Sequence, residues 1–224
     1  TIDYAIIKNG TTGIHVFSED PSNSDYTVTV TNTKIFNNAS YGIFIYSGAK
    51  VKAENCVIAK NGIHAMICLE GGDFNFNNCT LVGYGNGDGQ TPAIGIRNYF
   101  TRPDNNGIPT TFIGSIYEGK IYNSVIYGNY DREYVIDTLS GATLNFDFRD
   151  NHIRSTPVPT DNFFTSNGGN TYNLEPIFKS PSIYDFSVFS TSPLIGTANF
   201  GTASLSGIES NARGGSPDKG AYQF

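Results

Sequence analysis

The stretch Val51-Lys-Ala-Glu-Asn-Cys-Val-Ile-Ala-Lys-Asn-Gly62 recurs in outline as Phe74-Asn-Phe-Asn-Asn-Cys-Thr-Leu81. In each copy an alternating run leads to an Asn, first Asn55 and then Asn78, and an aliphatic residue follows three places later. A repeat with a period in the low twenties and short alternating strands inside it is typical of a β-solenoid. This repeat predicts the fold.

The same frame extends to further positions along the chain. The anchor column comprises Asp3, Asn32, Asn55, Asn78, Asn123 and Asp150. Three residues after the anchors stand Ile6, Ile35, Ile58, Leu81, Ile126 and Ile153. We expect this aliphatic column to face inward. We expect the Asn side chains to stack at a tight turn, because Asn tolerates unusual backbone angles and its amide both donates and accepts.

A third strand follows each anchor turn, at Gly13–Phe17, Gly42–Tyr46, Ala65–Leu69, Ala93–Arg97 and Glu133–Asp137. Three short strands per coil predict an all-β protein, a single-stranded right-handed parallel β-helix. We expect the coils to occupy residues 1–155. Residues 156–224 are expected to form an irregular excursion and a C-terminal capping tail of the same domain.

The amino-acid composition and charge exclude several classes of function. The 224 residues carry a net charge of −6 with only 15% charged residues, so a nucleic-acid-binding face is not expected. No stretch has the length and apolar character of a transmembrane helix, and no signal peptide is visible. We expect a piece of a longer precursor, with further N-terminal coils or another chain covering its first coil. Cys56 and Cys79 are expected to be stacked core thiols rather than a disulfide.

Insertions interrupt the period around the strand Ala93–Arg97. Residues 85–92 precede this strand and residues 101–118 follow it, and a smaller insertion at residues 19–25 leaves the same strand column in the first coil. Pro and Gly residues predict an irregular loop at 101–118. Because insertions in solenoids gather on the functional face, this column is where we expect a site.

Outward positions of the third strand are unusually apolar for a bare surface, and they include His15, Phe44 and Tyr46. One explanation is that these rings stack on sugars while Arg97, Asp137 and Tyr99 supply polar contacts. Alternatively, loops or the C-terminal segment cover the stripe, or a partner subunit covers it.

The C-terminal segment carries a series of short motifs. They are Pro176 with Phe178, Asp185–Val188, Ser192–Gly196 and Asp218–Phe224. This series resembles the end of secreted or surface-anchored bacterial β-helix proteins of the pectate-lyase-like (pectin lyase-like) superfamily, although Gly196 stands where that family usually has an Asp. The resemblance implies a tail that packs along the last coils and caps the solenoid. It also implies an extracellular or cell-surface location at the bacterial envelope.

The superfamily often cleaves polysaccharides, which makes Arg97 and Asp137 the catalytic candidates, as the outward charged pair of the column. A lyase needs a base beside a charge that neutralises a uronate, such as an Arg or a carboxylate-held Ca²⁺. The sequence shows no cluster of three acids for Ca²⁺. A hydrolase needs paired carboxylates, whereas Asp137 lacks an evident partner and Glu70 and Asp73 lie at a turn. His64 is expected to be a solvated turn residue.

Two functions follow. In the first, the chain binds a polysaccharide on the third-strand face through His15, Phe44, Tyr46 and Tyr99, and in its stronger form also cleaves it as a lyase or hydrolase. In the second, the chain is a non-catalytic structural or adhesive surface module.

Overall fold

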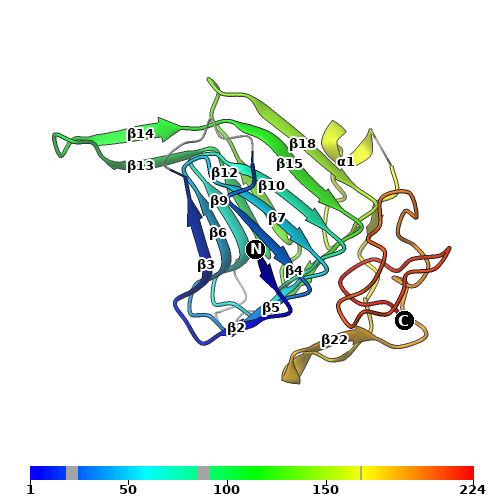
Figure 1. Cartoon of the computed structure of the whole chain (residues 1–224). Helices are drawn as coiled ribbons and strands as arrows, with labels where there is room; N and C mark the ends of the chain where they lie inside the picture. The colour runs from blue at the N-terminus through cyan, green and yellow to red at the C-terminus, as the bar shows by residue number, and fades with distance from the viewer. Residues whose placement is uncertain (19–24, 85–90, 167) are drawn as a thin grey trace.

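The computed structural model describes residues 1–18, 25–84, 91–166 and 168–224. Within them, parallel strands stack into three sheets that form the walls of a solenoid (Figure 1). Sheet A consists of β1 (Ile2–Asp3), β4 (Val28–Thr31), β7 (Lys50–Glu54), β10 (Asp73–Asn77), β15 (Ile116–Tyr122) and β18 (Leu144–Arg149). Sheet B consists of β2 (Ile6–Lys8), β5 (Lys34–Phe36), β8 (Val57–Ala59), β11 (Thr80–Gly83), β16 (Val125–Gly128), β19 (His152–Ile153) and β20 (Thr171–Tyr172). Sheet C consists of β3 (Thr12–Phe17), β6 (Tyr41–Tyr46), β9 (His64–Leu69), β12 (Ile94–Arg97) and β17 (Tyr134–Asp137).

The strand order confirms the parallel β-helix that the repeat predicts. Each coil passes from sheet A to sheet B to sheet C, and its strands pair with those of the neighbouring coils. Leu81, for example, pairs with Ile58 on one side and Ile126 on the other. All three are buried, as expected for the aliphatic column. The repeat frame therefore coincides with the hydrogen-bonding register from the second coil onward.

The first coil departs from the predicted frame by one residue. Ile7 pairs with Ile35, so Ile7 rather than Ile6 belongs to the inward column, and Ile6 is 64% exposed. Tyr4 rather than Asp3 occupies the turn position, because Tyr4 adopts the left-handed conformation, with φ at 50°. The predictions for Asp3 and Ile6 are therefore wrong.

Aromatic rings fill the interior behind sheet A. Phe74, Phe76 and Phe148 are almost fully buried, and the ring centroids of Phe74 and Phe148 lie 6.4 Å apart although a coil separates them. The intervening coil presents Gly119, where an added Cβ would lie 2.6 Å from the Phe146 ring. The absence of a side chain at Gly119 therefore makes room for the large rings around it.

In four of the coils the residue after the anchor closes the turn with its own side chain. The Thr33 hydroxyl donates to the carbonyl of Thr31 at 2.7 Å, and the Cys56 thiol donates to the carbonyl of Glu54 at 3.3 Å. Cys79 and Ser124 make the equivalent bonds in the next two coils. Cys56 and Cys79 are free and buried in the core, which confirms the prediction of core thiols at both positions.

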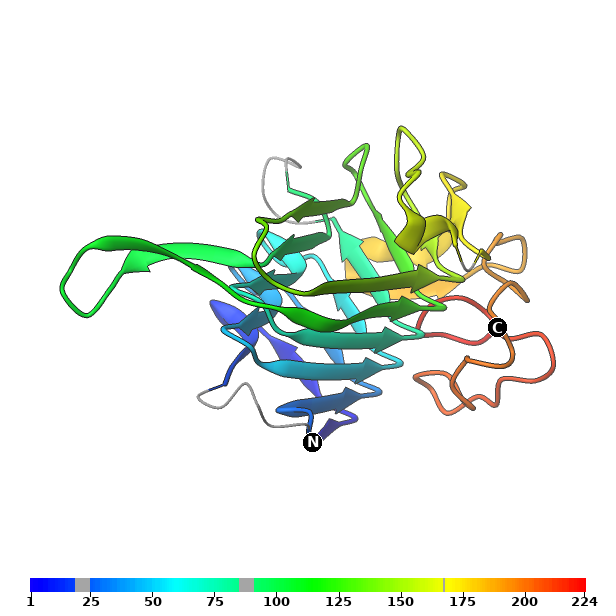
Figure 2. The ribbon, with the colours of Figure 1, turned by 90° about the horizontal axis from the view of Figure 1, so that it is seen from above.

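Residues 101–118, predicted to be an irregular loop, contain an antiparallel hairpin. Its strands are β13 (Tyr99–Pro103) and β14 (Pro109–Ile113), and Figure 2 shows the hairpin projecting from the solenoid on the side opposite the C-terminal tail. An Asp104 carboxylate oxygen closes its turn by accepting from the backbone N–H groups of Asn106 and Ile108. The insertions at 85–92 and 19–25 fall largely outside the described residues, since residues 85–90 and 19–24 are not described.

The segment that follows β19 covers the end of the last coil. The short helix α1 (Asn162–Thr165) presents Phe163 and Phe164 to the interior, and the Phe164 ring lies 5.2 Å from Phe148 and 4.9 Å from Tyr134, centroid to centroid. Beyond it, β20 extends sheet B by pairing with β19. Among the described residues, no helix has the length and apolar character needed to cross a membrane.

The C-terminal tail covers the outer face of sheet B instead of capping the solenoid end. The sheet contributes Val57, Ala59, Val82, Val125 and Tyr127, and the tail contributes Phe178, Phe186, Val188, Leu194, Ile208, Ala221 and Tyr222. The tail also forms a two-stranded hairpin of β21 (Phe178–Ser180) and β22 (Asp185–Val188), joined by the 3₁₀ turn η1 (Pro181–Ile183). The α1 segment, rather than the tail, covers the last coil, and the tail covers the apolar outer face of sheet B.

The Asn column fixes the tail in place. Asn32, Asn55, Asn78, Asn123 and Asp150 have φ between 48° and 59°, as expected for a tight turn. The expected amide ladder links Asn55 to Asn32, at 3.3 Å. Asn78 instead donates to the carbonyls of Asp218 and Gly220 and accepts from the backbone N–H of Ser204. The middle of the column therefore bonds the tail rather than the next Asn.

Replacing Asn78 by Gly tests this anchoring without straining the backbone, because Gly accepts the left-handed conformation. Loss of the Asn78 amide leaves buried tail groups unsatisfied, so we expect the free energy of unfolding to fall by about 2 kcal/mol and the tail to become sensitive to protease. The control is Asn32→Gly, since the Asn32 side chain hydrogen-bonds Asp3 and Asn55 in the neighbouring coils and does not contact the tail. Chemical denaturation and limited proteolysis measure both effects, and equal losses in the two variants would contradict the anchoring role.

A buried lysine joins the end of the tail to the last coil. Lys219 is 3% exposed, and its Nζ donates to the Gly169 carbonyl at 2.8 Å and to the Asn151 carbonyl at 3.2 Å. Burial lowers the pKa of Lys219 from 10.5 to about 8, against the opposing effect of Asp150. The charged form is therefore less favourable in the folded protein than in the unfolded chain.

The lowered pKa of Lys219 should make the free energy of unfolding increase with pH. Between about pH 8 and the ordinary lysine range the unfolded chain binds more protons at Lys219 than the folded protein, so its contribution grows by at most about 1.4 kcal/mol per pH unit. We expect Lys219→Met to remove this dependence, whereas Lys179→Met, at an exposed tail position, retains it. Urea denaturation at about pH 7 and about pH 9.5 measures the difference. The cysteines and tyrosines titrate equally in the two variants, so their contribution cancels in the comparison. Identical pH dependence of stability in the two variants would contradict the role of Lys219.

Candidate functional site

All six residues predicted for the site lie on the outer face of sheet C or at its edge. They are His15, Phe44, Tyr46, Arg97, Tyr99 and Asp137. Cross-coil pairing aligns two outward rows. The first row is His15, Phe44, Ile67, Gly95 and Val135, and the second is Phe17, Tyr46, Leu69, Arg97 and Asp137. The tail lies on sheet B, so it does not cover this face.

Aromatic side chains form the half of the face that belongs to the first two coils. His15 and Phe44 stack with ring centroids 4.5 Å apart and planes 3° from parallel. Tyr46 lies 5.7 Å from Phe44 and 6.0 Å from Phe100 at the base of the hairpin. Phe44 and Tyr46 are only partly exposed, whereas His15 is exposed. The structure therefore brings three of the predicted binding residues into one aromatic cluster.

Polar side chains form the other half of the face. Arg97 Nε lies 3.3 Å from Asp137 Oδ2, and the Tyr99 hydroxyl donates to the same oxygen at 2.8 Å. This hydrogen bond raises the pKa of Tyr99, with lesser contributions from burial and the Asp137 charge. The side chains of Arg97 and Asp137 are 51% and 42% exposed, so the cluster is accessible. The predicted catalytic pair is thus a surface ion pair held by a tyrosine.

A groove of about 450 Å³ lies between the two halves. Its lining comprises Tyr41, His64, Ile67, Leu69, Gly95, Arg97, Tyr99, Phe100, Thr101 and Val135. The His64 ring lies over Gly95, where an added Cβ would be 3.1 Å from His64 Nε2. The groove therefore combines an apolar floor with polar groups at one side, the usual composition of a ligand site.

His64 belongs to this groove, so its prediction as a solvated turn residue is wrong. It begins β9, and its Nδ1 lies 2.7 Å from the Pro92 carbonyl oxygen. Because a carbonyl only accepts, Nδ1 carries the proton and Nε2 is left as an acceptor in the neutral ring. Burial lowers the pKa of His64, partly offset by the Pro92 hydrogen bond, which keeps the ring neutral at physiological pH.

Four groove residues were not predicted from the sequence: Tyr41, His64, Phe100 and Thr101. Strict alternation from Ile43 would point Tyr41 inward. The intervening Gly42 also faces inward, because its added Cβ would collide with Ile58, and Tyr41 instead lies beside Phe44 and His64 on the outer face. The available signal for this break in alternation was a small residue just before the first inward aliphatic in four of the five strands, at Gly13, Gly42, Ala65 and Ala93.

The chemistry available on this face is limited. Asp137 is the one carboxylate among the outward sheet C residues that the structure describes. In the described part of the chain, no group of three or more His, Cys, Asp or Glu side chains is arranged to hold a metal ion. The face therefore presents stacking surfaces, one ion pair and the imidazoles of His15 and His64. This set suits binding of a polar ligand with flat apolar faces.

Comparison with known families agrees with this architecture. Residues 2–81 match the family model described as "Right handed beta helix region". No curated protein and no solved structure gave a significant match. Together with the three stacked parallel sheets, the match identifies the fold as a right-handed parallel β-helix.

The Tyr99–Asp137 bond provides a test of the polar half. Asp137→Asn removes the charge that the Tyr99 hydroxyl faces, so the pKa of Tyr99 should fall back toward the ordinary tyrosine value. NMR titration of the Tyr99 ring carbon measures this pKa. Asp131→Asn serves as the control, because Asp131 pairs with Arg154 at another site. An unchanged Tyr99 pKa in Asp137→Asn would show that the hydrogen bond does not exist in solution.

Proposed function

We propose that this protein binds a polysaccharide across the outer face of sheet C. The observation that carries the proposal is the aromatic cluster of His15, Phe44 and Tyr46 beside a groove edged by Arg97 and His64. Aromatic rings offer flat apolar surfaces to the C–H faces of sugars, while a few polar groups fix the orientation of the ligand.

The ligand suited to this face is extended rather than a single sugar. Five strands spaced by about 4.8 Å make the face roughly 19 Å long from the first coil to the last. The aromatic cluster lies at one end of that length and the Arg97–Asp137 pair at the other. A chain of several sugar units would contact both.

Binding is better supported than cleavage. Glycoside hydrolysis ordinarily needs two carboxylates flanking one bond, and Asp137 is already engaged by Arg97 and Tyr99. In this proposal Arg97 and Asp137 orient the ligand, and His64 Nε2 accepts a hydrogen bond from a sugar hydroxyl. An extracellular or cell-surface setting, with access to such polymers, is part of the same proposal.

A second candidate is a structural or adhesive module that binds another protein. The projecting hairpin favours it, because Ile108 at the turn is 59% exposed and Ile113 is 43% exposed. A protein partner would bury these side chains, whereas a glycan on sheet C would leave them open.

The two candidates are separated by a glycan array on the purified chain, followed by affinity measurements on the best glycan. We expect Phe44→Ala and His15→Ala each to weaken glycan binding about tenfold, the equivalent of ~1.4 kcal/mol. Phe200→Ala is the matched control, because Phe200 is an exposed aromatic of the tail, far from sheet C in the chain's architecture.

Parallel samples with Ca²⁺ and with a chelator, assayed for new chain ends, test cleavage. Ca²⁺-dependent binding and cleavage of a uronate polymer, lost in Arg97→Met, would restore the lyase hypothesis. Absence of any bound glycan, or equal affinity of wild type and Phe44→Ala, would contradict the proposed binding face and favour the adhesive module.

A further inference from the structure

A second pocket lies where the strands of sheet C turn into sheet A. It has a volume of about 560 Å³. Its lining comprises Ser47, Gly48, Lys50, Glu70, Gly72, Asp73, Ile113, Gly114, Ser115 and Tyr117. The two ends of the hairpin separate it from the groove on sheet C, because β13 lines the groove and the end of β14 lines this pocket. The pocket is therefore a distinct site beside the proposed binding face.

Tight backbone turns form the hollow. Ser47, Gly48, Glu70 and Gly71 all have left-handed backbone angles, which turn the chain sharply between the two sheets. An added Cβ at Gly114 would collide with the Glu70 carbonyl oxygen. Glycine at position 114 thus allows the chain returning from the hairpin to lie directly against the turn of the preceding coil.

Glu70 is a fixed supporting group on one side of the pocket. It is 8% exposed, and Arg102 donates to both carboxylate oxygens, with Nε–Oε2 at 3.2 Å and Nη2–Oε1 at 3.0 Å. Ser47 adds a third hydrogen bond, at 3.3 Å. The bidentate Arg102 contact largely satisfies this carboxylate and ties the hairpin to the solenoid.

Asp73 and Lys50, in contrast, keep free capacity for hydrogen bonding. Asp73 is 5% exposed, and its Oδ1 accepts from the backbone N–H groups of Tyr117 and Glu118 at 2.7 and 3.0 Å. Its Oδ2 forms an ion pair with Lys50 Nζ at 3.7 Å, a distance too long for a hydrogen bond, and accepts no hydrogen bond from the described residues. An acceptor and a donor are therefore held side by side as a loose ion pair, and each keeps capacity for a hydrogen bond to a ligand.

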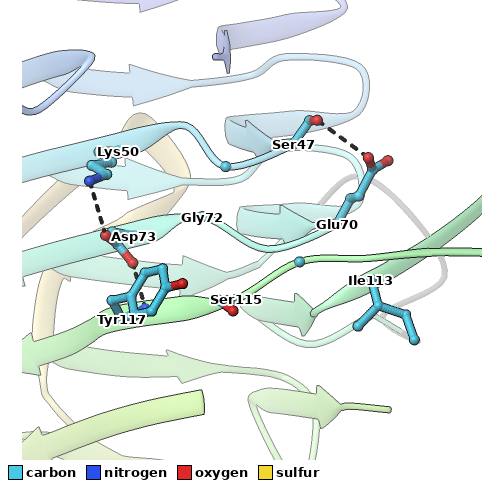
Figure 3. A pocket seen from close by; sticks show the side chains of 10 residues that line it. Ser47, Lys50, Glu70, Gly72, Asp73, Ile113, Ser115 and Tyr117 are labelled. Atoms are coloured by element: carbon cyan, nitrogen blue, oxygen red, sulfur yellow. Dashed lines mark hydrogen bonds and ion pairs between the residues drawn. The ribbon is translucent and has the colours of Figure 1, made fainter. Parts of the chain in front are cut away.

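Tyr117 completes the site with a flat apolar surface. Its side chain is 62% exposed, and its hydroxyl makes no hydrogen bond to the described residues. Figure 3 shows Lys50, Asp73 and Tyr117 adjacent to one another on three successive coils, with Ser47 and Glu70 at the other side. The pocket thus offers a ring face, an acceptor, a donor and hydroxyl groups within one hollow.

We propose that this pocket binds one uncharged sugar ring of the polysaccharide that lies on sheet C, as a branch or terminal residue. The inference rests on the proposed function. Neighbouring sugar hydroxyls can donate to Asp73 Oδ2 and accept from Lys50 while the ring stacks on Tyr117. A uronate would bring its carboxylate against Asp73 and Glu70, and this like-charge contact disfavours acidic sugars.

The pocket lies within reach of a ligand on sheet C. Tyr46 ends β6 and precedes Ser47, and Leu69 ends β9 and precedes Glu70. Burial raises the pKa of Tyr46, and the Glu70 charge raises it further. A polysaccharide stacked on Tyr46 would therefore lie beside residues that line the pocket.

The test combines NMR titration with affinity measurements on Lys50→Met and Tyr117→Ala. Matched controls are Lys52→Met, on the outward face of the same strand, and Tyr130→Ala, an exposed tyrosine elsewhere. Asp73 is left intact because it holds two backbone amides. Neutral, amino and uronic monosaccharides are titrated first, followed by the glycan selected on the array. Thermal melting verifies that each variant is folded.

We expect neutral monosaccharides to shift the backbone resonances of Lys50, Asp73 and Tyr117, and uronates to shift them far less. Both pocket variants should lose these shifts and bind the branched or short glycan about tenfold more weakly, while both controls behave as wild type. Glycan affinity that falls in Phe44→Ala but is unchanged in both pocket variants would overturn this inference and leave the proposed function standing. Pocket shifts without any contribution from Phe44 would instead refute the sheet C face and retain the pocket. A preference for uronates at the pocket would overturn the assigned sugar class.

Discussion

A single residue in the left-handed conformation at each turn from sheet A to sheet B sets the register of the solenoid. Most residues resist this conformation, and Asn tolerates it because its short side chain bonds locally. In four coils the next residue then donates to the carbonyl two positions before it, as Thr33 and Cys56 do. The aliphatic residue two positions further on then enters the core. The stacking of coils thus depends on one backbone angle repeated in each coil.

The Asn column also explains why the tail covers sheet B and leaves sheet C uncovered. The Asn78 side chain hydrogen-bonds Ser204, Asp218 and Gly220 of the tail instead of the next coil. The Asn55 side chain accepts a hydrogen bond from the Ser204 hydroxyl. These contacts hold the tail over the apolar outer face of sheet B. The tail thereby covers the outer face of sheet B. It leaves the apolar outward residues of sheet C available to the hairpin and to a ligand.

The coils were predictable because each constraint that forms them is local and repeats. Leu81 and its partners follow from spacing alone, and Arg97 and Asp137 meet because they occupy equivalent positions in adjacent coils. The first coil was misplaced because Tyr4 adopts an angle expected of Asn or Asp. The hairpin was read as a loop because the Pro and Gly residues that end its strands resemble loop residues.

The second pocket lay beyond sequence reasoning for a different reason. Its residues come from turns in three coils and from the end of the hairpin, none of which carries a periodic signal. Glu70 and Asp73 were visible as turn residues, but their different roles depend on Arg102 reaching back from the hairpin and on the amide of Tyr117. Such contacts follow from the path of the chain in space and not from spacing.

The most direct test of the account is a crystal structure of the chain with its tightest-binding oligosaccharide. We predict sugar rings stacked on Phe44 and Tyr46, with further units in the groove toward Arg97 and the tail unmoved on sheet B. A ligand seated on the tail or on the outer face of sheet A, with sheet C bare, would contradict the claim that the open wall of the solenoid is its binding face.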